Sequence, residues 1–308
     1  MDKLSLDEID QRLHLRCCFA ENQYAAYFLS PSQFAPFADR VGAVRASTYR
    51  QVSPLGPTEL DLDGRDAHYW HLLIFDRERQ CLAGALRMSL SCWHGSDWDG
   101  SRSYLEHCYP GLDAAMKQRG VRYAEIGRTF VSPSYQRTSP VLRMLLRAMA
   151  SIPMAAGHDH LLGMVSYNHM QHSEELHQRF LHELLQPPFR VDYALPQPRH
   201  PFPLPIGMQS QAFPMAEALS LNQLERVLKE RYQEPFRAPL LLKKYMGFGN
   251  ARVVGLSIAR DFNQICEILM LCKLNELNPR QVNEWIVADL TPVWEQSVQS
   301  CFDGANLV

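Results

Sequence analysis

Two apolar runs joined by a short polar turn constrain the fold of this chain more than any other feature. Residues 69–76 and 81–90 have the length and apolar content of strands, and the turn 76–80 suits an antiparallel connection. The patterns that follow alternate between helix and strand, at 104–119, 122–131, 139–152, 160–167 and 173–185. This order predicts an α/β fold with a mixed, mostly antiparallel central sheet flanked by helices.

The remaining segments are divided by a stretch that is rich in proline. Apolar residues at helical spacing predict a first helix over 6–19 and a second over 36–52. Residues 186–214 hold too many prolines for a helix, so we expect a loop or an extended arm. Beyond this arm the patterns again indicate helices and strands, at 220–232, 239–249, 251–262, 267–274 and 279–287.

These patterns predict four parts of the chain. An N-terminal helical segment covers 1–26, and a core that holds the central sheet covers 27–185. The proline-rich loop or arm covers 186–214. A C-terminal α/β extension, packed on the core, covers 215–308.

Length and composition are those of a globular protein, and they exclude several classes. The 308 residues are 46% hydrophobic, and the net charge of −2 gives no basic field for nucleic acid. The N-terminus is polar and acidic, which is not typical of a signal peptide. No apolar run approaches the ~20 residues of a membrane span. We expect a cytoplasmic protein, with peripheral contact at the inner face of the membrane as an open alternative.

The cysteines and histidines do not indicate a metal or redox site. The eight cysteines are scattered without a C-x-x-C pair. The histidine-rich stretches 158–160 and 169–172 lack a third ligand at a suitable spacing. We therefore expect no metal and no cofactor.

An acidic loop precedes the first of the two apolar runs. Its carboxylates belong to Glu59, Asp61, Asp63 and Asp66. Carboxylates packed this closely could bind a cation or the ammonium group of a substrate. A solvated acidic loop is the simpler alternative.

Two apolar strands carry charged residues that must be paired or functional. Arg87 lies in the run 81–90, where a structural ion pair is the simplest explanation. Glu125 and Arg128 lie in the run 122–131, and strand alternation puts Glu125 on one face and Arg128 on the other. A buried carboxylate has a raised pKa, which suits a general base or a clamp for an amine.

The turn 132–141 joins a predicted strand to a predicted helix. Backbone N–H groups at such a helix start can hold an anion, and Arg137 could add a charge for a phosphate. Phosphate-binding loops of this kind are usually rich in glycine, yet this turn has none. The alternative is a plain connection in which Pro140 starts the helix.

Taken in order, these motifs resemble the acyltransferases that make ornithine lipids and other N-acyl amino acids. These enzymes are relatives of the acyl-homoserine-lactone synthases in the GCN5-related N-acetyltransferase (GNAT) superfamily. The resembling motifs are Arg45-x-x-x-Tyr49, Asp63-Gly-Arg-Asp66, His71-Leu-Leu, Gly84-Ala-Leu-Arg87, Glu125-Ile-Gly-Arg128 and Phe130-Val-x-Pro133-x-Tyr135-Gln-Arg137. Residues 238–280 resemble a tail of the amino-acid acyltransferases that the homoserine-lactone synthases lack.

The resemblance implies a GNAT-like fold and the transfer of a long acyl chain, either plain or 3-hydroxylated, to an amine such as ornithine or glycine. Glu125 would clamp or deprotonate the amine, with Arg128 as the second catalytic residue. Asp63 and Asp66 would attract the acceptor ammonium, and Arg87 or Arg128 its carboxylate. The implied substrate-binding residues are Asp63, Asp66, His71, Arg87 and Arg45. The loop around 168–175 departs from the family pattern, which leaves the acceptor open.

The implied acyl-donor-binding residues are Phe130, Val131, Ser132, Arg137, Ser139 and Val141. Backbone N–H groups at 130–132 would stabilise the oxyanion. A turn without glycines fits two linked phosphates poorly, whereas phosphopantetheine on acyl carrier protein has one phosphate, which Arg137 could hold. We therefore expect acyl carrier protein as the partner, docked through Arg137, Arg143 and Arg147. Acyl-coenzyme A is the alternative co-substrate.

Two other classes stay open. One is an acyl-homoserine-lactone-type synthase, against which the tail argues. The other is a non-catalytic protein that binds acyl carriers or lipids, against which Glu125 and Arg128 argue. Acyl transfer to an amine separates the enzyme from the binder.

Overall fold

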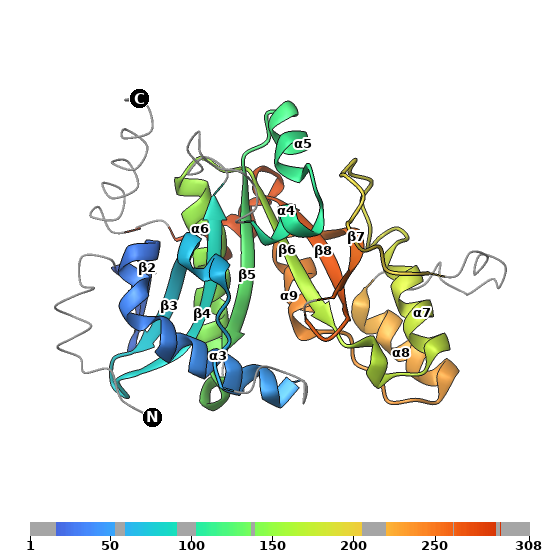
Figure 1. Cartoon of the computed structure of the whole chain (residues 1–308), viewed down its shortest axis with the longest axis horizontal. Coiled ribbons are helices and arrows are strands. Elements are labelled where there is room, and N and C mark those ends of the chain that lie inside the picture. The colour runs from blue at the N-terminus through green and yellow to red at the C-terminus, as the bar shows by residue number, and fades with distance from the viewer. Residues whose placement is uncertain are drawn as a thin grey trace.

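The computed structural model describes residues 17–52, 59–90, 103–136, 139–204, 220–260, 262–287 and 290. One eight-stranded sheet organises them, with the strand order β1-β2-β3-β4-β5-β6-β8-β7 (Figure 1). Its strands are β1 (Cys17–Glu21), β2 (Tyr24–Leu29), β3 (Trp70–Asp76), β4 (Cys81–Leu90), β5 (Tyr123–Val131), β6 (His160–Tyr167), β7 (Arg252–Ala259) and β8 (Ile265–Lys273). Neighbouring strands pair antiparallel except β5 and β6, which are parallel. The predicted mixed, mostly antiparallel sheet is confirmed.

Helices cover both faces of the sheet. The α-helices are α2 (Pro31–Phe34), α3 (Ala38–Val52), α4 (Tyr104–Cys108), α5 (Leu112–Gln118), α6 (Ser139–Ala155), α7 (Glu174–Leu184), α8 (Leu221–Tyr232), α9 (Leu240–Gly249) and α10 (Pro279–Trp285). The 3-10 helices are η2 (Ala35–Phe37), η3 (Gly64–His68), η4 (Pro133–Tyr135), η5 (His169–Gln171) and η8 (Leu274–Glu276). The core clusters place α3, α4 and α5 on one face and α6 to α9 on the other. We call these the α3–α5 face and the α6–α9 face.

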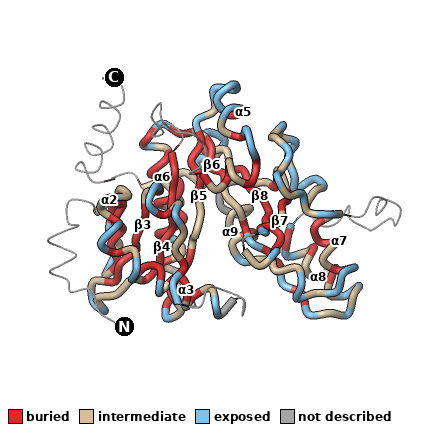
Figure 2. The backbone as a smooth tube through the Cα atoms, in the orientation of Figure 1, coloured by how far each residue is buried: buried red, intermediate tan, exposed pale blue. Residues whose placement is uncertain are grey.

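Burial explains why several strands are apolar along their whole length. All six residues of β2 are buried, as are all of β8 except Lys273 (Figure 2). A strand covered on both faces gains from apolar side chains at every position, so its sequence shows no polar alternation. The predicted hairpin of residues 69–76 and 81–90 is found as β3 and β4, with His71 opposite Arg87.

The N-terminal prediction was wrong where it can be checked. A helix was expected over 6–19, but Cys17 to Phe19 belong to β1, which pairs with β2; residues 1–16 lie outside the described part. The run Cys-Cys-Phe-Ala can join either element, and pairing with a fully buried β2 decides in favour of the strand. The helix expected over 104–119 is two helices, because Pro110 and Gly111 (φ 86°) separate α4 from α5.

The C-terminal extension contributes to the same sheet. β8 pairs with β6 along its whole length, from His160 opposite Lys273 to Tyr167 opposite Cys266. β7 then forms the sheet edge beside β8. The four-part division of the chain stays a prediction, but the strands of the core and of the C-terminal extension belong to one hydrogen-bonded sheet.

The parallel pair β5 and β6 separates part of the way along. Their pairing runs only from Tyr123 opposite His160 to Ile126 opposite Gly163, although both strands continue further. Among the described residues, no strand lies between the two continuing ends. Helix α9 covers this gap on the α6–α9 face, where the Tyr245 hydroxyl lies 3.4 Å from the Thr129 hydroxyl.

Within the described residues, no helix combines the length and the apolar character that crossing a bilayer requires.

The last paired position of β5 and β6 depends on a glycine. A Cβ at Gly163 would lie 2.7 Å from the carbonyl oxygen of Ile126, a backbone atom that cannot move aside cheaply. We expect Gly163→Ala to lower the free energy of unfolding by about 1–3 kcal/mol. The measurement is urea denaturation followed by circular dichroism.

Gly247→Ala is the matched control, because a Cβ at that position in α9 would meet no atom within 4 Å. Alanine favours a helix over glycine by about 0.5–1 kcal/mol, so this variant should be neutral or slightly more stable. Equal losses in both variants would contradict the close approach of β5 and β6.

Candidate active site

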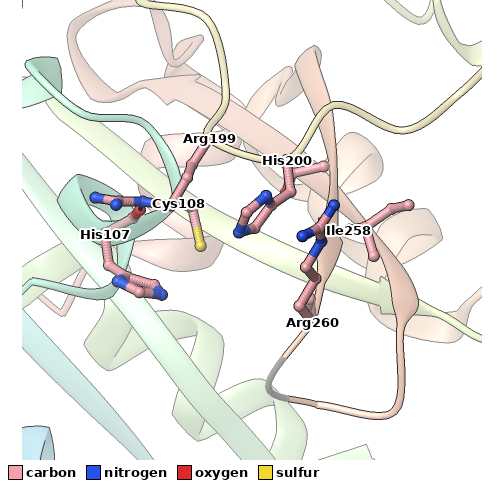
Figure 3. Close-up of a pocket in the computed structure, with 8 residues that line it drawn as sticks. His107, Cys108, Arg199, His200, Ile258 and Arg260 are labelled. Atoms are coloured by element: carbon pink, nitrogen blue, oxygen red, sulfur yellow. Dashed lines mark hydrogen bonds between the residues drawn. The ribbon is translucent and has the colours of Figure 1, made fainter.

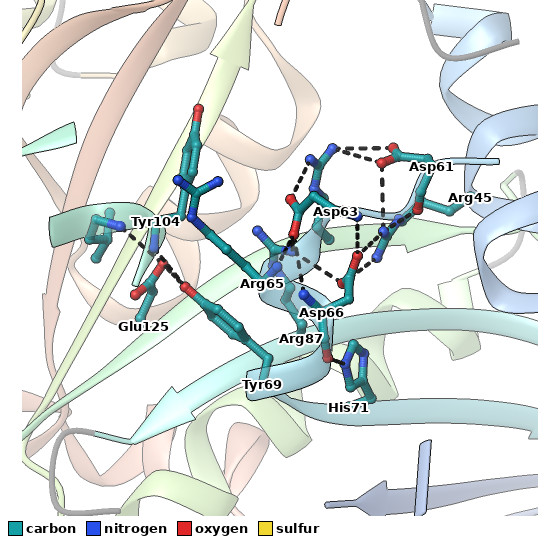
Figure 4. Close-up of polar contacts among 12 residues, drawn as sticks. Arg45, Asp61, Asp63, Arg65, Asp66, Tyr69, His71, Arg87, Tyr104 and Glu125 are labelled. Carbon is teal, nitrogen blue, oxygen red and sulfur yellow. Dashed lines mark hydrogen bonds and ion pairs between the residues drawn. The ribbon is translucent and has the colours of Figure 1, made fainter. Parts of the chain in front are cut away.

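Three arginines and three aspartates form a network on the α3–α5 face, in which all but Arg128 and Asp63 are buried (Figure 4). We call it the Arg–Asp cluster. Its members are Arg45 from α3, Arg87 from β4, Arg128 from β5, and Asp61, Asp63 and Asp66 from the loop before β3. The sequence predicted five of these residues as site residues and placed Asp61 in the same acidic loop. The structure brings all six together.

Each arginine of the cluster contacts two aspartates. Arg45 binds Asp66 with both terminal nitrogens, at 3.2 and 2.8 Å, and it also contacts Asp61. Arg87 donates to Asp63 at 2.9 Å and to Asp66 at 3.1 Å. The network closes through Arg128.

Arg128 donates to Asp61 at 3.2 Å and to Asp63 at 3.1 Å. Three guanidinium groups thus face three carboxylates, and the charges cancel. The alternative of a solvated acidic loop does not hold for Asp61 and Asp66, which are buried.

The electrostatics of the cluster keep its members charged. Burial raises the pKa of Asp66, but the hydrogen bond and charge of Arg45 outweigh it, so this pKa lies well below its ordinary value. The pKa of Asp63 is also lowered, because Arg87 outweighs burial. Burial lowers the pKa of Arg87, yet its neighbours, Tyr69 and Asp66 first, raise it well above the ordinary value. Asp63, Asp66 and Arg87 are therefore more stable in their charged forms than in their neutral forms inside the protein.

His71 supports the cluster from β3. Its Nε2 lies 2.8 Å from the carbonyl oxygen of Asp66, and its ring stacks on Phe34 with centroids 3.4 Å apart. Burial lowers the pKa of His71 to about 4, although Asp66 opposes this shift. A neutral His71 that donates through Nε2 fits this contact. The predicted acceptor-site residue therefore packs behind the acidic loop and fixes its shape.

Glu125 lies buried beside the cluster on the same face. Its carboxylate accepts hydrogen bonds from the Tyr69 hydroxyl at 2.6 Å, the Ser103 hydroxyl at 2.6 Å and the Leu105 N–H at 3.2 Å. Burial raises the pKa of Glu125, although the bonds from Ser103 and Tyr69 and the charge of Arg87 oppose the shift. Only 3% of this residue is exposed, so it acts on other groups through these hydroxyls.

The predicted alternation of Glu125 and Arg128 was wrong. Arg128 has a positive φ of 52°, and the register with β4 shifts by one residue beside it, between the pairs Ala85–Phe130 and Arg87–Gly127. Such a β-bulge adds a residue to one strand and turns its side chain. Arg128 therefore contacts Asp61 and Asp63 on the face of Glu125 rather than on the opposite one.

The described residues that were expected to bind the acyl donor lie in the apolar core or are hydrogen-bonded to β4. Phe130 and Val141 are buried in apolar clusters, and Val131 packs against the larger cluster. Ser132 donates its N–H to Ala83 at 2.9 Å and its hydroxyl to Leu82 at 2.7 Å. The expected oxyanion donors therefore do not include Ser132, because both of its hydrogens are used by β4.

Two further residues of the expected donor site fall outside what can be described. Arg137 lies outside the described residues, as does the side chain of Ser139 at the start of α6. Arg143 and Arg147, expected to dock acyl carrier protein, both pair with Glu21 of β1, the former at 2.6 Å. Arg143 keeps 55% of its side chain exposed, so it stays accessible to a partner.

The sequence analysis missed the residues that link the cluster to the rest of the site. Tyr69 stacks under the Arg87 guanidinium at 4.5 Å and accepts a hydrogen bond from the Tyr104 N–H at 2.8 Å. The Tyr104 hydroxyl donates to Glu267 of β8 at 2.7 Å. A tyrosine at the start of an apolar strand was the available signal for Tyr69, whereas Tyr104 and Glu267 are far apart in sequence.

Within the described ranges, histidine, cysteine, aspartate and glutamate side chains form no group of three or more that could hold a metal ion.

Comparisons with known proteins agree with this architecture. A family profile for the acetyltransferase (GNAT) domain matches residues 44–147, which span the Arg–Asp cluster, Glu125 and most of α6. No curated protein is significantly similar to the sequence. Residues 44–147 therefore form an acetyltransferase (GNAT) domain within this mixed sheet, which supports an acyltransferase enzyme.

Several solved structures are similar to this chain at low identity. The acyl-homoserine lactone synthase BjaI is 12% identical, with a TM-score of 0.43 and coverage of 91% of this chain and 98% of that chain. The N-acyl amino acid synthase FeeM, from uncultured soil microbes, is 15% identical, with a TM-score of 0.31 and coverage of 57% and 86%. The loading GNATL domain of CurA from Lyngbya majuscula is 12% identical, with a TM-score of 0.37 and coverage of 83% and 100%.

The buried part of the Arg–Asp cluster should dominate stability. Arg45→Met leaves Asp66 buried with one cationic partner fewer, so we expect a loss of about 3–5 kcal/mol in the free energy of unfolding. Arg143→Met removes an exposed ion pair and should cost less than about 1 kcal/mol. Denaturant titration of both variants measures the difference, and similar losses would refute the dominance of the cluster.

Stability should also fall in mild acid because of His71. Its folded pKa of about 4 lies below the ordinary 6.5, so between these values the unfolded chain binds the proton and the folded chain does not. The free energy of unfolding should decrease by about 3 kcal/mol from this residue as the pH falls from 6.5 to 4. His158, whose pKa is also lowered to about 4, adds a similar decrease.

The test compares the pH dependence of unfolding in the wild type and His71→Gln, whose amide can still donate to Asp66. The variant should lose the decrease that comes from His71 and keep the decrease that comes from the other histidines with a lowered pKa, which are His158, His169 and His177. Parallel curves for the two proteins would show that His71 is not held neutral by its surroundings.

Proposed function

We propose that this protein transfers a long-chain acyl group, including 3-hydroxyacyl chains, from acyl carrier protein to the amine of an amino acid. Ornithine and glycine are examples of the acceptors that the family resemblance implies, and the product is an N-acyl amino acid or lyso-aminolipid. In the reaction the amine nitrogen bonds to the thioester carbonyl carbon. The carbon–sulfur bond then breaks, and the phosphopantetheine thiol leaves with a proton.

The separation of β5 from β6 carries this proposal. Past Ile126 and Gly163 the facing edges of the two strands have no strand between them within the described residues. Open strand edges present N–H and carbonyl groups that bind an extended chain. The phosphopantetheine arm is such a chain, with two amides along its length. The thioester at its end would then lie beside the bulge at Arg128 and the carboxylate of Glu125.

Glu125 is the proposed proton acceptor. Its raised pKa makes the carboxylate more basic than an exposed one, as a general base for an amine requires. The hydroxyls of Ser103 and Tyr69 both donate to it, and each can pass on a proton taken from the amine. Arg128 and Arg87 hold Asp61, Asp63 and Asp66 in fixed positions, and the cluster orients the acceptor beside the thioester.

The acyl chain needs an apolar channel, and the structure has a small apolar cavity where such a channel would start. A narrow cavity of about 30 Å³ lies where β5 and β6 separate, lined by apolar side chains that include Met149, Tyr245 and Met270. This volume holds about one methylene group, so a long chain requires α9 to shift away from the sheet. The Tyr245–Thr129 contact is the polar link that such a shift would break.

Acyl carrier protein is proposed as the donor because the turn after β5 lacks the glycines that admit a pyrophosphate. Arg143, exposed on α6, gives an acidic carrier a contact. Its pairing with Glu21, which also binds Arg147, reduces the charge that is available there. The carrier therefore has to compete with Glu21.

The direct test is amide formation with defined substrates. Purified protein is incubated with dodecanoyl and 3-hydroxydodecanoyl thioesters of acyl carrier protein or coenzyme A, together with ornithine, glycine and the other amino acids. Mass spectrometry then identifies amide products. Faster transfer from the carrier protein supports the proposed donor, and S-adenosylmethionine as the only acceptor would favour a homoserine-lactone synthase. No product from any amine would favour a non-catalytic binder.

Glu125→Gln should lower kcat/KM by about 10²–10⁴-fold, because the amide cannot accept the proton from the amine. In the wild type kcat/KM should rise with pH through the pKa of Glu125, and the variant should lose this rise. A loss of rate with an unchanged pH profile would show that Glu125 only positions Tyr69 and α4.

Glu183→Gln is the control for replacing a buried carboxylate. Glu183 lies in α7, is also buried, and pairs with Arg179 at 2.6 Å, away from the cluster. This variant should leave the pH profile of the wild type intact.

A further inference from the structure

A second group of basic side chains lies at the far end of the α3–α5 face. They surround a cavity of about 230 Å³ between α4, the segment 199–200 and the end of β7 (Figure 3). The residues that define it are His107, Cys108, Arg199, His200, Ser257 and Arg260. Cys108 and Ser257 form the buried floor, whereas Arg199 and Arg260 are exposed at the rim. We call it the α4–β7 cavity.

The walls of the α4–β7 cavity are fixed by hydrogen bonds on two sides. The N–H of Arg199 donates to the carbonyl oxygen of Cys108 at 2.7 Å, and its Nε donates to that of His107 at 2.9 Å. On the other side the N–H of Ile258 donates to the carbonyl oxygen of His200 at 2.8 Å. The segment 199–200 therefore joins α4 to β7, and the basic side chains are held around one space.

The charges of the cavity differ from those of the Arg–Asp cluster. The three arginines of the cluster are matched by three aspartates, so none is left to bind a carboxylate. In contrast, no ion pair joins Arg199 or Arg260 to a carboxylate of the described residues. The carboxylate of Glu267, beneath Cys108, accepts from the Tyr104 hydroxyl at 2.7 Å. Counting the described residues only, the rim thus carries an excess of positive charge.

The α4–β7 cavity adjoins the catalytic region. The loop that follows β7 carries both Arg260 and Phe262, and the Phe262 ring lies 5.7 Å from the Arg128 guanidinium. Helix α4 connects the same two regions, since Ser103 before it bonds Glu125 and Cys108 at its end lines the cavity. One acceptor molecule could therefore reach both.

We propose that the α4–β7 cavity binds the acidic group of the amine acceptor, a carboxylate, while the amine lies beside the β5 bulge. This inference rests on the proposed function. Arginine pairs with carboxylate through two parallel hydrogen bonds, and the half-buried His107 and His200 supply further donors. The charges of Arg87 and Arg128, which the motifs suggested for this role, are already neutralised by Asp61, Asp63 and Asp66.

The distance between the two regions indicates the shape of the acceptor. Two strands lie between β5 and β7, and β5 and β6 diverge beside the bulge, so at least three strand spacings, about 14 Å or more, separate them across the sheet. The long side chain of Arg260 shortens this gap but does not remove it. We therefore expect the acidic group to be several bonds from the acylated amine, as in an ω-amino acid.

The experiment compares acids with their neutral amides as acceptors. The probes are glycine with glycinamide and 6-aminohexanoate with 6-aminohexanamide, each given with dodecanoyl-acyl carrier protein. The measured quantity is the ratio of KM for the amide to KM for the acid. In the wild type this ratio should be about ten or more for the 6-aminohexanoate pair and smaller for the glycine pair. Arg260→Gln, which removes no hydrogen bond or ion pair of the described structure, should bring the ratio near one.

Arg252→Gln is the matched control, because Arg252 starts β7, which ends just before Arg260, and its side chain bonds only to the Ala251 carbonyl oxygen within the described structure. It should keep the wild-type ratio. Equal KM values for 6-aminohexanoate and its amide in the wild type, or an unchanged ratio in Arg260→Gln, would overturn the cavity assignment while amide formation still supports the proposed function. No amide product from these probes or from the amino acids tested above would overturn both.

Discussion

The ion pairs of the Arg–Asp cluster connect the acidic loop before β3 to one helix and two strands. Arg45 arrives on α3, Arg87 on β4 and Arg128 on β5, and the short acidic loop before β3 binds all three. Because the charges are buried, removing one partner leaves another without compensation, so the loop is fixed rather than mobile. The position of Glu125 follows from it, since Tyr69 joins this carboxylate to Arg87.

The bulge in β5 brings two features of the candidate site to the same place in the sheet. The β5 bulge turns Arg128 toward the cluster, and next to it β5 leaves β6. A regular pairing of β4 with β5 would have sent Arg128 to the α6–α9 face. One irregularity therefore supplies a charged residue for the cluster and lies beside the open strand edges that suit an acyl thioester.

The sequence predicted the sheet well and the site only in part. Strand β4 begins and ends at the predicted residues, and β6 does as well, because apolar runs bounded by polar turns are local signals. The β1–β2 hairpin was not predicted, since a short apolar segment fits helix or strand until its neighbour is known. Most cluster residues were found from their motifs, but the partners Tyr104 and Glu267 were not, because 163 positions separate them in the chain.

The amino-acid sequence by itself determined the type and order of most elements from β3 onward, and it identified the charged residues that lie in apolar strands. It could not determine which charges neutralise one another, because pairing depends on distances between segments far apart in the chain. Only the tertiary structure showed that Arg87 and Arg128 are matched by aspartates, whereas Arg199 and Arg260 face open space at the α4–β7 cavity. A substrate carboxylate pairs with a cation whose charge is not already neutralised. Which cations are neutralised depends on distances that only the fold sets.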